Sequence, residues 1–198
     1  MSRTLHAILL STALAFPAIA ALKPGASAPD FSAKGSLAGK AFDFSLKDAL
    51  KKGSVVVYFY PAAFTQGCNI EAHTFAESKE KFDAAGATIV GVSRDSVERL
   101  HEFSADPAYC AGKFPVVSDP DGSIAKAYNL NTVDTSKFKG PIKDSKGRDV
   151  TTELTERTTF VITKDSKILA TLSSADDKVT PVEHVDKSLA LVQGLAGN

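Results

Sequence analysis

The chain holds two residues capable of sulfur chemistry, Cys68 and Cys110, and they lie far apart in the sequence. Neither belongs to a Cys-x-x-Cys pair. This absence argues against a thioredoxin-type disulfide exchanger and against a zinc site made of cysteines. The histidines do not have metal-ligand spacing either, so the sequence indicates no metal and no cofactor.

Cys68 follows a short turn after an apolar run and is expected in the first turn of a helix over Thr65–Ala85. The first N–H groups of a helix lack intrahelical partners, and the helix dipole adds partial positive charge there. A thiolate is stabilised at such a position, and the thiolate is the form of cysteine that attacks. Attack on a peroxide yields a sulfenic acid and water or an alcohol.

Peroxide cleavage also needs donors for the oxygen that leaves with growing negative charge. Thr65 lies about one turn before Cys68, so its hydroxyl can face the same pocket, as can the backbone N–H groups of Gly67 and Cys68. Pro61 has no N–H and a rigid ring, so it can exclude water without competing for the thiolate. These residues form a candidate peroxide site.

The remaining chain supplies elements that can position this site. Apolar and β-branched runs predict strands, and apolar residues three, four and seven apart predict helices. Asp95-Ser96-Val97-Glu98 predicts a capping box that opens a second helix, and Thr180-Pro181-Val182-Glu183 predicts another. The expected strands are 41–46, 55–60, 87–92, 114–117, 158–163 and 168–172, and the last helix covers 180–191. This order predicts an α/β fold with a mixed central sheet and helices on both faces.

Length and composition limit the possible functions. The chain has 198 residues, 43% of them hydrophobic, and 23 basic residues balance 23 acidic ones. Such a chain can build one core, and its balanced charge does not indicate nucleic acid as a partner. We expect one domain over 21–198, with 21–41 as an extended lead-in and 131–156 as a long loop or small hairpin.

The first twenty residues have the pattern of a cleavable signal peptide. Arg3 precedes an apolar stretch over 7–16, and Ala18-Ile19-Ala20 is a small-x-small cleavage signal. A membrane anchor needs about 20 apolar residues, and this stretch is shorter. We therefore expect cleavage after Ala20 and a secreted, periplasmic protein without stable membrane insertion. Export permits a disulfide between the two cysteines.

The motif Pro61-x-x-x-Thr65-x-x-Cys68 is similar to the signature of the peroxiredoxins. The surrounding residues resemble the subgroup called peroxiredoxin Q or bacterioferritin comigratory protein. Further blocks in the same order cover about residues 24–192. These blocks are Ala28–Phe31, Gly91–Ser96, Ser118–Gly122, Ala125–Tyr128 and Arg157–Ile162.

This resemblance implies a thioredoxin-like fold and a peroxidase that uses a thiol reductant to reduce hydrogen peroxide and alkyl hydroperoxides. It implies that Cys68 is peroxidatic, that Thr65 hydrogen-bonds the peroxide and that Pro61 shields the pocket. It also implies that Arg157 holds the thiolate and steers the peroxide. A guanidinium suits this role because it stays charged and offers several donors in a fixed fork.

The sequence departs from the subgroup at His73, where many members carry a second cysteine. This leaves Cys110 as the candidate resolving residue, in an intramolecular disulfide with Cys68. Because a disulfide needs Cα atoms within about 7 Å, we expect the first turn at Cys68, the segment 105–113, or both to unwind. Gln66 replaces a frequent proline and should only adjust the turn.

Several alternatives stay open at this point. The chain could be a one-cysteine peroxidase resolved by an external thiol, a peroxide-sensing switch protein, or a module with a permanent disulfide. Glu71 could pair with an active-site arginine or simply favour the helix start. Arg94 is a candidate second cation near the site, Thr65 could be an N-cap alone, and His73 is expected on the helix surface.

Overall fold

The structure is a computed structural model that describes residues 20–133 and 138–197. Most of the expected signal peptide therefore lies outside the described residues. The strands are β1 (Ser32–Leu37), β2 (Lys40–Ser45), β3 (Ser54–Phe59), β4 (Ala87–Ser93), β5 (Val116–Ser118), β6 (Thr158–Ile162) and β7 (Ile168–Ser173). The helices are α1 (Leu46–Leu50), α2 (Gln66–Ala84), α3 (Val97–Ala105), α4 (Ser123–Ala127) and α5 (Pro181–Ala196).

The described strands form one seven-stranded sheet in the order β2-β1-β5-β4-β3-β6-β7. The central strands β3, β4 and β5 are parallel, whereas β6 pairs with β3 and β1 pairs with β5 in antiparallel fashion. The sheet is therefore mixed, as the sequence predicts. The three parallel strands bring their carboxyl ends to one edge of the sheet, where loops gather.

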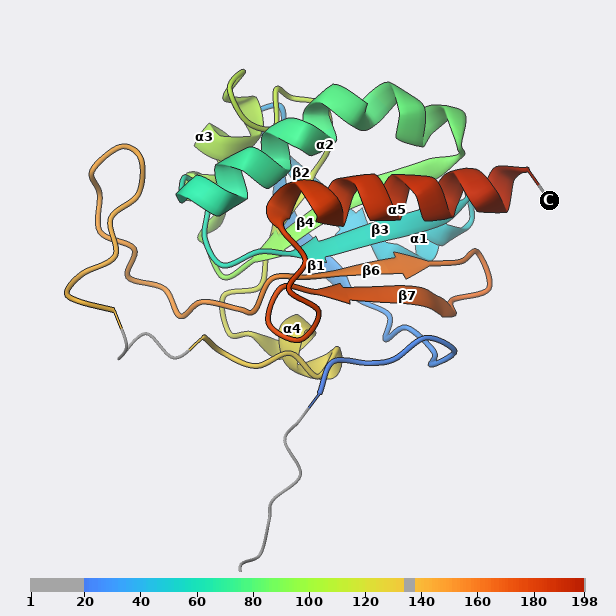
Figure 1. Ribbon diagram of the computed structural model, residues 1–198. Helices are drawn as coiled ribbons and strands as arrows, with labels where there is room; N and C mark the ends of the chain where they lie inside the picture. Colours follow the sequence, from blue (N-terminus) through green and yellow to red (C-terminus); the bar gives the residue numbers. More distant parts are fainter. Residues whose placement is uncertain (1–19, 134–137, 198) are drawn as a thin grey trace, which may run out of the picture.

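Both faces of the sheet are covered, because the residues of β3 are all buried and alternate between two cores. Val56 and Tyr58 face a core shared with α2, α3 and α5, whereas Val55, Val57 and Phe59 face a core shared with α1 and α4. Figure 1 shows α2 and α5 side by side over one face of the sheet and α4 below the other. This continuous apolar run is typical of a strand buried on both sides.

The helices α2 and α5 begin in different ways. The Thr180 hydroxyl caps α5 by accepting from the backbone N–H of Glu183. The Glu183 carboxylate in turn accepts from the backbone N–H of Thr180, as predicted. Thr65 occupies the N-cap position of α2 without a side-chain capping bond. The start of α2 is thus set by the loop before it rather than by a local cap, and this loop carries the candidate site.

Two elements differ from the expectation. Residues 32–37 form β1 rather than an extended lead-in, and the one-turn helix α1 follows β2. The sequence Ser-Ala-Lys-Gly-Ser-Leu has little β propensity. It forms a strand because Gly35 lets the backbone approach β5, where a Cβ would lie 2.1 Å from the Val116 carbonyl oxygen. Such tertiary contacts are not visible in local sequence.

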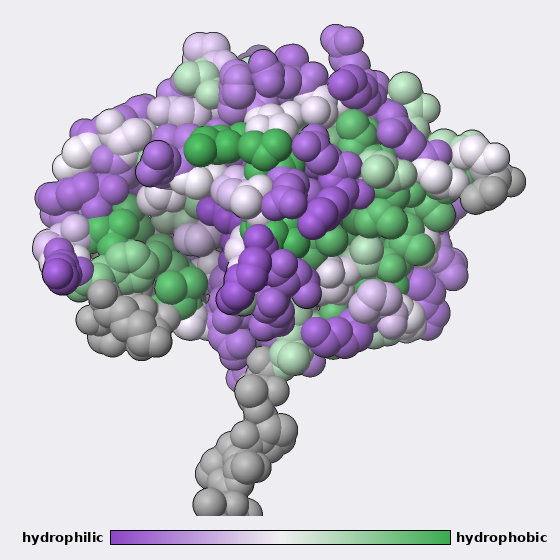
Figure 2. All heavy atoms as spheres, viewed as in Figure 1, coloured by the Kyte–Doolittle hydropathy of each residue, from purple (hydrophilic) through white to green (hydrophobic). Residues whose placement is uncertain are grey.

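The surface is mostly polar on the face that carries α2 and α5. Figure 2 shows hydrophilic residues over much of this face and hydrophobic surface gathered toward the end of α5. Across residues 20–133 and 138–197, no helix is long and apolar enough to cross a membrane.

Candidate active site

The candidate site lies at the carboxyl edge of the parallel strands. A short turn after β3 places Cys68 in the first turn of α2, where its side chain is 1% exposed. Arg157 directly precedes β6, and the antiparallel pairing of Phe59 with Thr158 brings it to the same edge. The sheet topology thus joins two residues that are 89 positions apart.

Arg157 contacts both the sulfur and a buried carboxylate. Its Nη2 donates to Cys68 Sγ at 3.2 Å, and its Nη1 donates to Glu71 Oε2. Burial raises the pKa of Glu71 to about 7, although the charge and hydrogen bond of Arg157 act against this rise. Burial also acts to lower the pKa of Arg157, but the charges of Glu71 and Cys68 outweigh it and raise that pKa. Arg157 therefore stays cationic beside the sulfur.

Gly67 makes room for this approach. A Cβ at Gly67 would lie 3.0 Å from Arg157 Nη2 and 3.6 Å from Pro181 Cγ. A contact of 3.0 Å between a methyl carbon and a guanidinium nitrogen requires one of them to move. The glycine therefore allows the guanidinium to lie against the first turn of α2, and α5 closes the other side.

The Thr65 hydroxyl lies at the helix start with its proton already engaged. Its Oγ1 donates to the Ala62 carbonyl at 2.8 Å. Its lone pairs are then the groups available to a ligand, so Thr65 is oriented to accept a hydrogen bond. Pro61, on the same turn, is partly exposed, which suits a shield between the sulfur and solvent.

The side chain of Asp95 holds the turn before Cys68 by a hydrogen bond to its backbone. Its Oδ2 accepts from Ala63 N at 2.7 Å and from Ser93 Oγ at 2.8 Å, and its side chain is buried. The capping box predicted at Asp95 is wrong, because Ser96 caps α3 by accepting from Arg99 N. Asp95 instead points inward and accepts from the backbone N–H of Ala63. Without this bond, that N–H would be a buried donor without a partner.

Phe64 completes this turn with a backbone φ of 65°, in the left-handed region that is costly for a bulky residue. Its ring is fully buried, and the cationic groups of Arg99, Lys146 and Arg148 lie 5.4, 4.1 and 4.9 Å from the ring centre. Strained backbone of this kind persists where its surroundings hold it, and it clusters at functional sites.

Cys110 lies in the same core as Cys68, past the end of α3. Both sulfurs are free thiols, and Cys110 is fully buried. Burial, together with the charge of Asp106, raises the pKa of Cys110 well above its usual value. In this conformation Cys110 is therefore a neutral core thiol rather than a nucleophile.

The structure settles several roles that the sequence left open. Glu71 pairs with Arg157, and His73 is half exposed beside Glu77, as expected. Arg94 pairs with Glu153 and bonds the Pro120 carbonyl, and none of its described hydrogen bonds reaches Cys68. Its role as a second cation near the site stays a prediction.

His184 is a buried residue near the site that sequence reasoning missed. Its Nδ1 lies 2.9 Å from Thr159 Oγ1, and its Nε2 lies 2.9 Å from Ser174 Oγ. The backbone of Ser174 donates to the Arg157 carbonyl at 3.1 Å, so His184 helps to fix the strand end that carries Arg157. No local pattern in the sequence signals the burial of this histidine.

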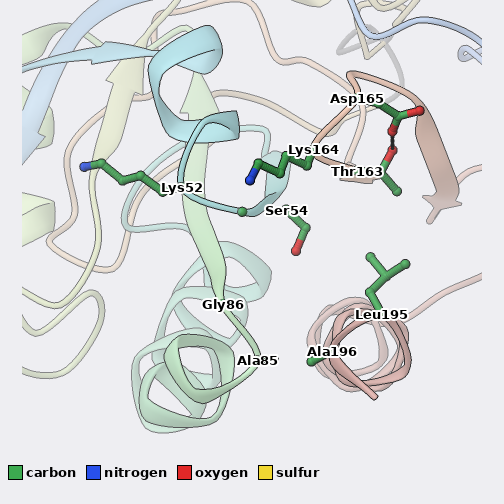
Figure 3. Close-up of a pocket in the computed structure, with 10 residues that line it drawn as sticks. Lys52, Ser54, Ala85, Gly86, Thr163, Lys164, Asp165, Leu195 and Ala196 are labelled. Atoms are coloured by element: carbon green, nitrogen blue, oxygen red, sulfur yellow. Dashed lines mark hydrogen bonds between the residues drawn. The ribbon is translucent and has the colours of Figure 1, made fainter. Parts of the chain in front are cut away.

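A pocket of about 590 Å³ lies at the opposite edge of the sheet. Figure 3 shows Ser54, where β3 begins, Gly86, just before β4, and Leu195 near the end of α5 around this pocket. Its lining shares no residue with the Cys68 site. We therefore assign the chemistry to the carboxyl edge, where a charged donor meets a sulfur.

The arrangement around Cys68 can stabilise a thiolate and receive the charge of a departing oxygen. A cation that lies 3.2 Å from the sulfur favours the ionised form. The low exposure of the sulfur strengthens this interaction. These features fit an attack by sulfur on an O–O bond.

Comparisons with known proteins point to the same chemistry. Residues 24–171 match the model of the AhpC/TSA family. The chain is 33% identical to peroxiredoxin Bcp of Xanthomonas campestris, over 72% of this chain and 78% of that protein. It is 30% identical to the chloroplastic peroxiredoxin Q of Sedum lineare, over 77% of this chain and 75% of that protein.

Solved structures confirm the thioredoxin-like peroxiredoxin fold that the sequence predicts. Peroxidoxin BcpB from Mycobacterium tuberculosis superposes with a TM-score of 0.68 at 28% identity, over 88% of this chain and 98% of that one. The bacterioferritin comigratory protein of Xanthomonas campestris gives 0.63 at 30% identity, over 82% and 91%. Family, fold and relatives agree, and the chain therefore belongs to the AhpC/TSA family as a thiol-dependent peroxidase of the Bcp and peroxiredoxin Q kind.

Proposed function

We propose that the chain reduces hydrogen peroxide and alkyl hydroperoxides through Cys68, with Cys110 as the resolving cysteine. The observation that carries this proposal is the hydrogen bond from Arg157 to the Cys68 sulfur in the first turn of α2. A positive charge and a helix N-terminus act together there on one sulfur.

In the first step the Cys68 thiolate attacks one peroxide oxygen and the O–O bond breaks. The sulfur is oxidised to sulfenic acid, and the other oxygen leaves and takes a proton to become water or an alcohol. Arg157 stabilises the thiolate and then the developing charge on the leaving oxygen. Thr65 accepts a hydrogen bond from the peroxide, because its own proton is held by Ala62.

In the second step the Cys110 thiol condenses with the sulfenic acid, so that a disulfide forms and water leaves. Both cysteines belong to one core. Cys110 is nevertheless buried and free here, and its raised pKa disfavours attack. The first turn of α2, the segment 105–113, or both therefore open before the bond forms in this scheme.

A related protein supports alkyl hydroperoxides as substrates, because an alkyl peroxide reduction activity is named for the bacterioferritin comigratory protein of Xanthomonas campestris.

The small-x-small signal ending at Ala20 supports export and a periplasmic location. Ala21 and Leu22, which follow the expected cleavage point, pack against the core, and Leu22 N donates to Tyr128 O at 3.2 Å. The reductant in this scheme is a thiol or dithiol of that compartment.

A second candidate is a one-cysteine cycle in which an external thiol reduces the Cys68 sulfenic acid. The complete burial of Cys110 favours it, because a thiol in the core reacts slowly. The two cycles differ in the product that one equivalent of peroxide leaves behind.

The test compares the protein with its Cys68→Ser and Cys110→Ser variants. Mass spectrometry after one equivalent of peroxide should show an intramolecular disulfide in the unaltered protein and no oxidation in Cys68→Ser. Cys110→Ser should consume the first equivalent at the same rate and accumulate sulfenic acid. Turnover by Cys68→Ser would contradict the peroxidatic assignment. Normal dithiol-driven cycling by Cys110→Ser would replace the disulfide route with the one-cysteine cycle.

A further inference from the structure

One surface loop touches both segments that carry the cysteines. Residues 143–149, here called the clamp loop, belong to the long connection between α4 and β6. The mechanism above does not use this loop, although it reaches the turn before Cys68 on one side and the end of α3 on the other. Figure 1 shows the connection extending away from the sheet at the end where α2 begins.

The contacts of the clamp loop to the Cys68 side run through Ser145. Its backbone N–H donates to the Phe64 carbonyl at 2.8 Å, and its Oγ accepts from Asn69 Nδ2 at 3.3 Å. Asn69 directly follows Cys68, and Asn69 Nδ2 also lies 3.3 Å from the Phe64 carbonyl. Ser145 therefore ties the strained residue before the site to the residue after the sulfur.

The contacts to the Cys110 side use the same serine and two cations. Ser145 Oγ lies 3.3 Å from the hydroxyl of Tyr109, the neighbour of Cys110. Arg148 and Lys146 pair with Glu102 of α3 at 2.9 and 3.4 Å. The clamp loop thus holds both α3 and the segment that must move to release Cys110.

Asp144 gives the clamp loop its shape. Its side chain is fully buried and accepts from the backbone amides of Lys146 and Arg148 at 2.9 and 2.8 Å. It also accepts from the side chains of Arg99, at 2.8 Å, and Arg148, at 2.9 Å. Burial alone would raise the pKa of Asp144, but the hydrogen bonds from Arg148, Lys146 and Arg99 lower it to about 2. The loop is therefore anchored by a carboxylate that stays ionised.

The side-chain hydrogen bonds of Ser145 are exposed and border open space, whereas the side chain of Asp144 is buried. Gln66, Asn69 and Ile70 on α2 face Lys143, Asp144 and Ser145 across a hollow of about 430 Å³. Contacts of this kind release more readily than packed apolar surfaces, because water can replace each hydrogen bond. The clamp loop can therefore detach without opening the core of the sheet.

We infer that the clamp loop sets the rate at which the Cys68 sulfenic acid becomes a disulfide, and that Asp144 and Ser145 are positioning residues for this step. The inference rests on the proposed role of Cys110. While the loop is attached, both cysteine-bearing segments keep the conformation in which the sulfurs are unbonded. Detachment frees the turn at Phe64 and the segment at Tyr109 together.

Two reactions then compete for the sulfenic acid. Condensation with the Cys110 thiol forms the S–S bond and releases water. Attack by the sulfenic sulfur on a second peroxide breaks its O–O bond, forms sulfinic acid and releases water or an alcohol. A tighter clamp lengthens the life of the sulfenic acid and increases the share that is lost to sulfinic acid.

The experiment measures three quantities in each variant: the rate of sulfenic acid formation, the rate of disulfide formation and the sulfinic share under excess peroxide. Ser145→Ala removes the bridge to Asn69 and Tyr109, and Asp144→Asn weakens the anchor. We expect disulfide formation to be about fivefold faster in each, as for the loss of one typical hydrogen bond. The sulfinic share should fall, with the first step unchanged.

Asp149→Asn is the matched control, because Asp149 pairs only with Lys143 of the same loop among the described residues, at 2.7 Å. It should behave like the unaltered protein. Ser145→Thr keeps the hydroxyl and should restore slow disulfide formation. This rescue would not be seen if Ser145 were needed only for general stability.

Unchanged disulfide rates in both Ser145→Ala and Asp144→Asn would overturn the inference, as would a first step that slows in proportion. The absence of any Cys68–Cys110 disulfide in the unaltered protein would instead contradict the proposed function. The two failures are therefore distinguishable in one data set.

Discussion

At the scale of single residues, the site depends on one close approach. The guanidinium of Arg157 reaches Cys68 through Nη2 because Gly67 has no side chain, and Glu71 accepts from Nη1. The motif Pro61-x-x-x-Thr65-x-x-Cys68 predicts the sulfur and its hydroxyl neighbour. The same motif gives no reason for a glycine at 67 beyond helix-start geometry.

Gly67→Ala should lower the rate with peroxide without lowering the stability of the fold. Alanine favours a helix over glycine by about 0.5–1 kcal/mol, so the midpoint of thermal unfolding should stay equal or rise. The added methyl group displaces Arg157, and the second-order rate with peroxide should fall about tenfold or more, as for a lost bond to a charged group. Stopped-flow kinetics and calorimetry measure the two effects.

Gly194→Ala is the control for this change, since a Cβ there meets no atom within 4 Å. It should gain stability and keep full activity. A Gly67→Ala protein with the original rate would show that the guanidinium does not need its present position.

At the scale of elements, α5 and the ends of β6 and β7 form a support for Arg157. His184 of α5 bridges Thr159 and Ser174, and burial, helped by the charge of Arg157, lowers the pKa of His184 to about 3. The other charged groups that act on His184 are Lys187, Glu183 and Asp177. The histidine is therefore neutral wherever the enzyme is folded at moderate pH.

His184→Gln should make the free energy of unfolding depend less on pH below about pH 6.5. Between pH 6.5 and about 3 the unfolded chain protonates this histidine and the folded chain does not, so stability falls as pH decreases. The slope is about 1.4 kcal/mol per pH unit for one proton. Glu71, whose pKa is raised, acts with the opposite sign, but it is common to both proteins. Urea unfolding from pH 4 to 7 measures the difference in slope.

His73→Gln provides the comparison for this prediction, because His73 is half exposed on α2. Its curve should follow that of the unaltered protein. Equal slopes of the unfolding free energy against pH in His184→Gln and the unaltered protein would mean that His184 is protonated in the folded state.

The elements that the sequence predicts well are those with long periodic or apolar patterns, such as α2, β3 and β4. The prediction fails where a neighbour decides the outcome. Strand β1 depends on the approach of Gly35 to β5, and on α5 the apolar Val182 is 42% exposed while His184 is buried. The link from Arg157 to Cys68 came from family resemblance, because spacing does not reveal which strands are neighbours.

At the scale of the whole molecule, we expect oxidation to move the loops at the carboxyl edge of the sheet and to leave the strands in place. The parallel core of β3, β4 and β5 is flanked by antiparallel pairs, and β3 is buried on both faces. The turn at Phe64, the clamp loop and the segment 105–113 all lie outside the strands. Oxidation is therefore expected to change the edge and leave the sheet intact.

Hydrogen exchange of reduced and oxidised protein should reveal this division. If the proposed disulfide forms, peptides covering 64–70, 105–113 or both should lose protection after one equivalent of peroxide, because we expect these segments to unwind. Peptides from β3, β4 and β6 should exchange as slowly as before. Cys110→Ser, treated in the same way, should keep its protection everywhere. Equal loss of protection in the sheet would show that disulfide formation needs global opening.

The separation of 89 positions between Cys68 and Arg157 also has a consequence for biosynthesis. A ribosome releases the cysteine before it makes the arginine, so the growing chain keeps the two groups apart. Until the β6 hairpin docks beside β3, the sulfur lacks the guanidinium that favours its ionised form. The two groups therefore meet only when almost the entire chain has been made and folded.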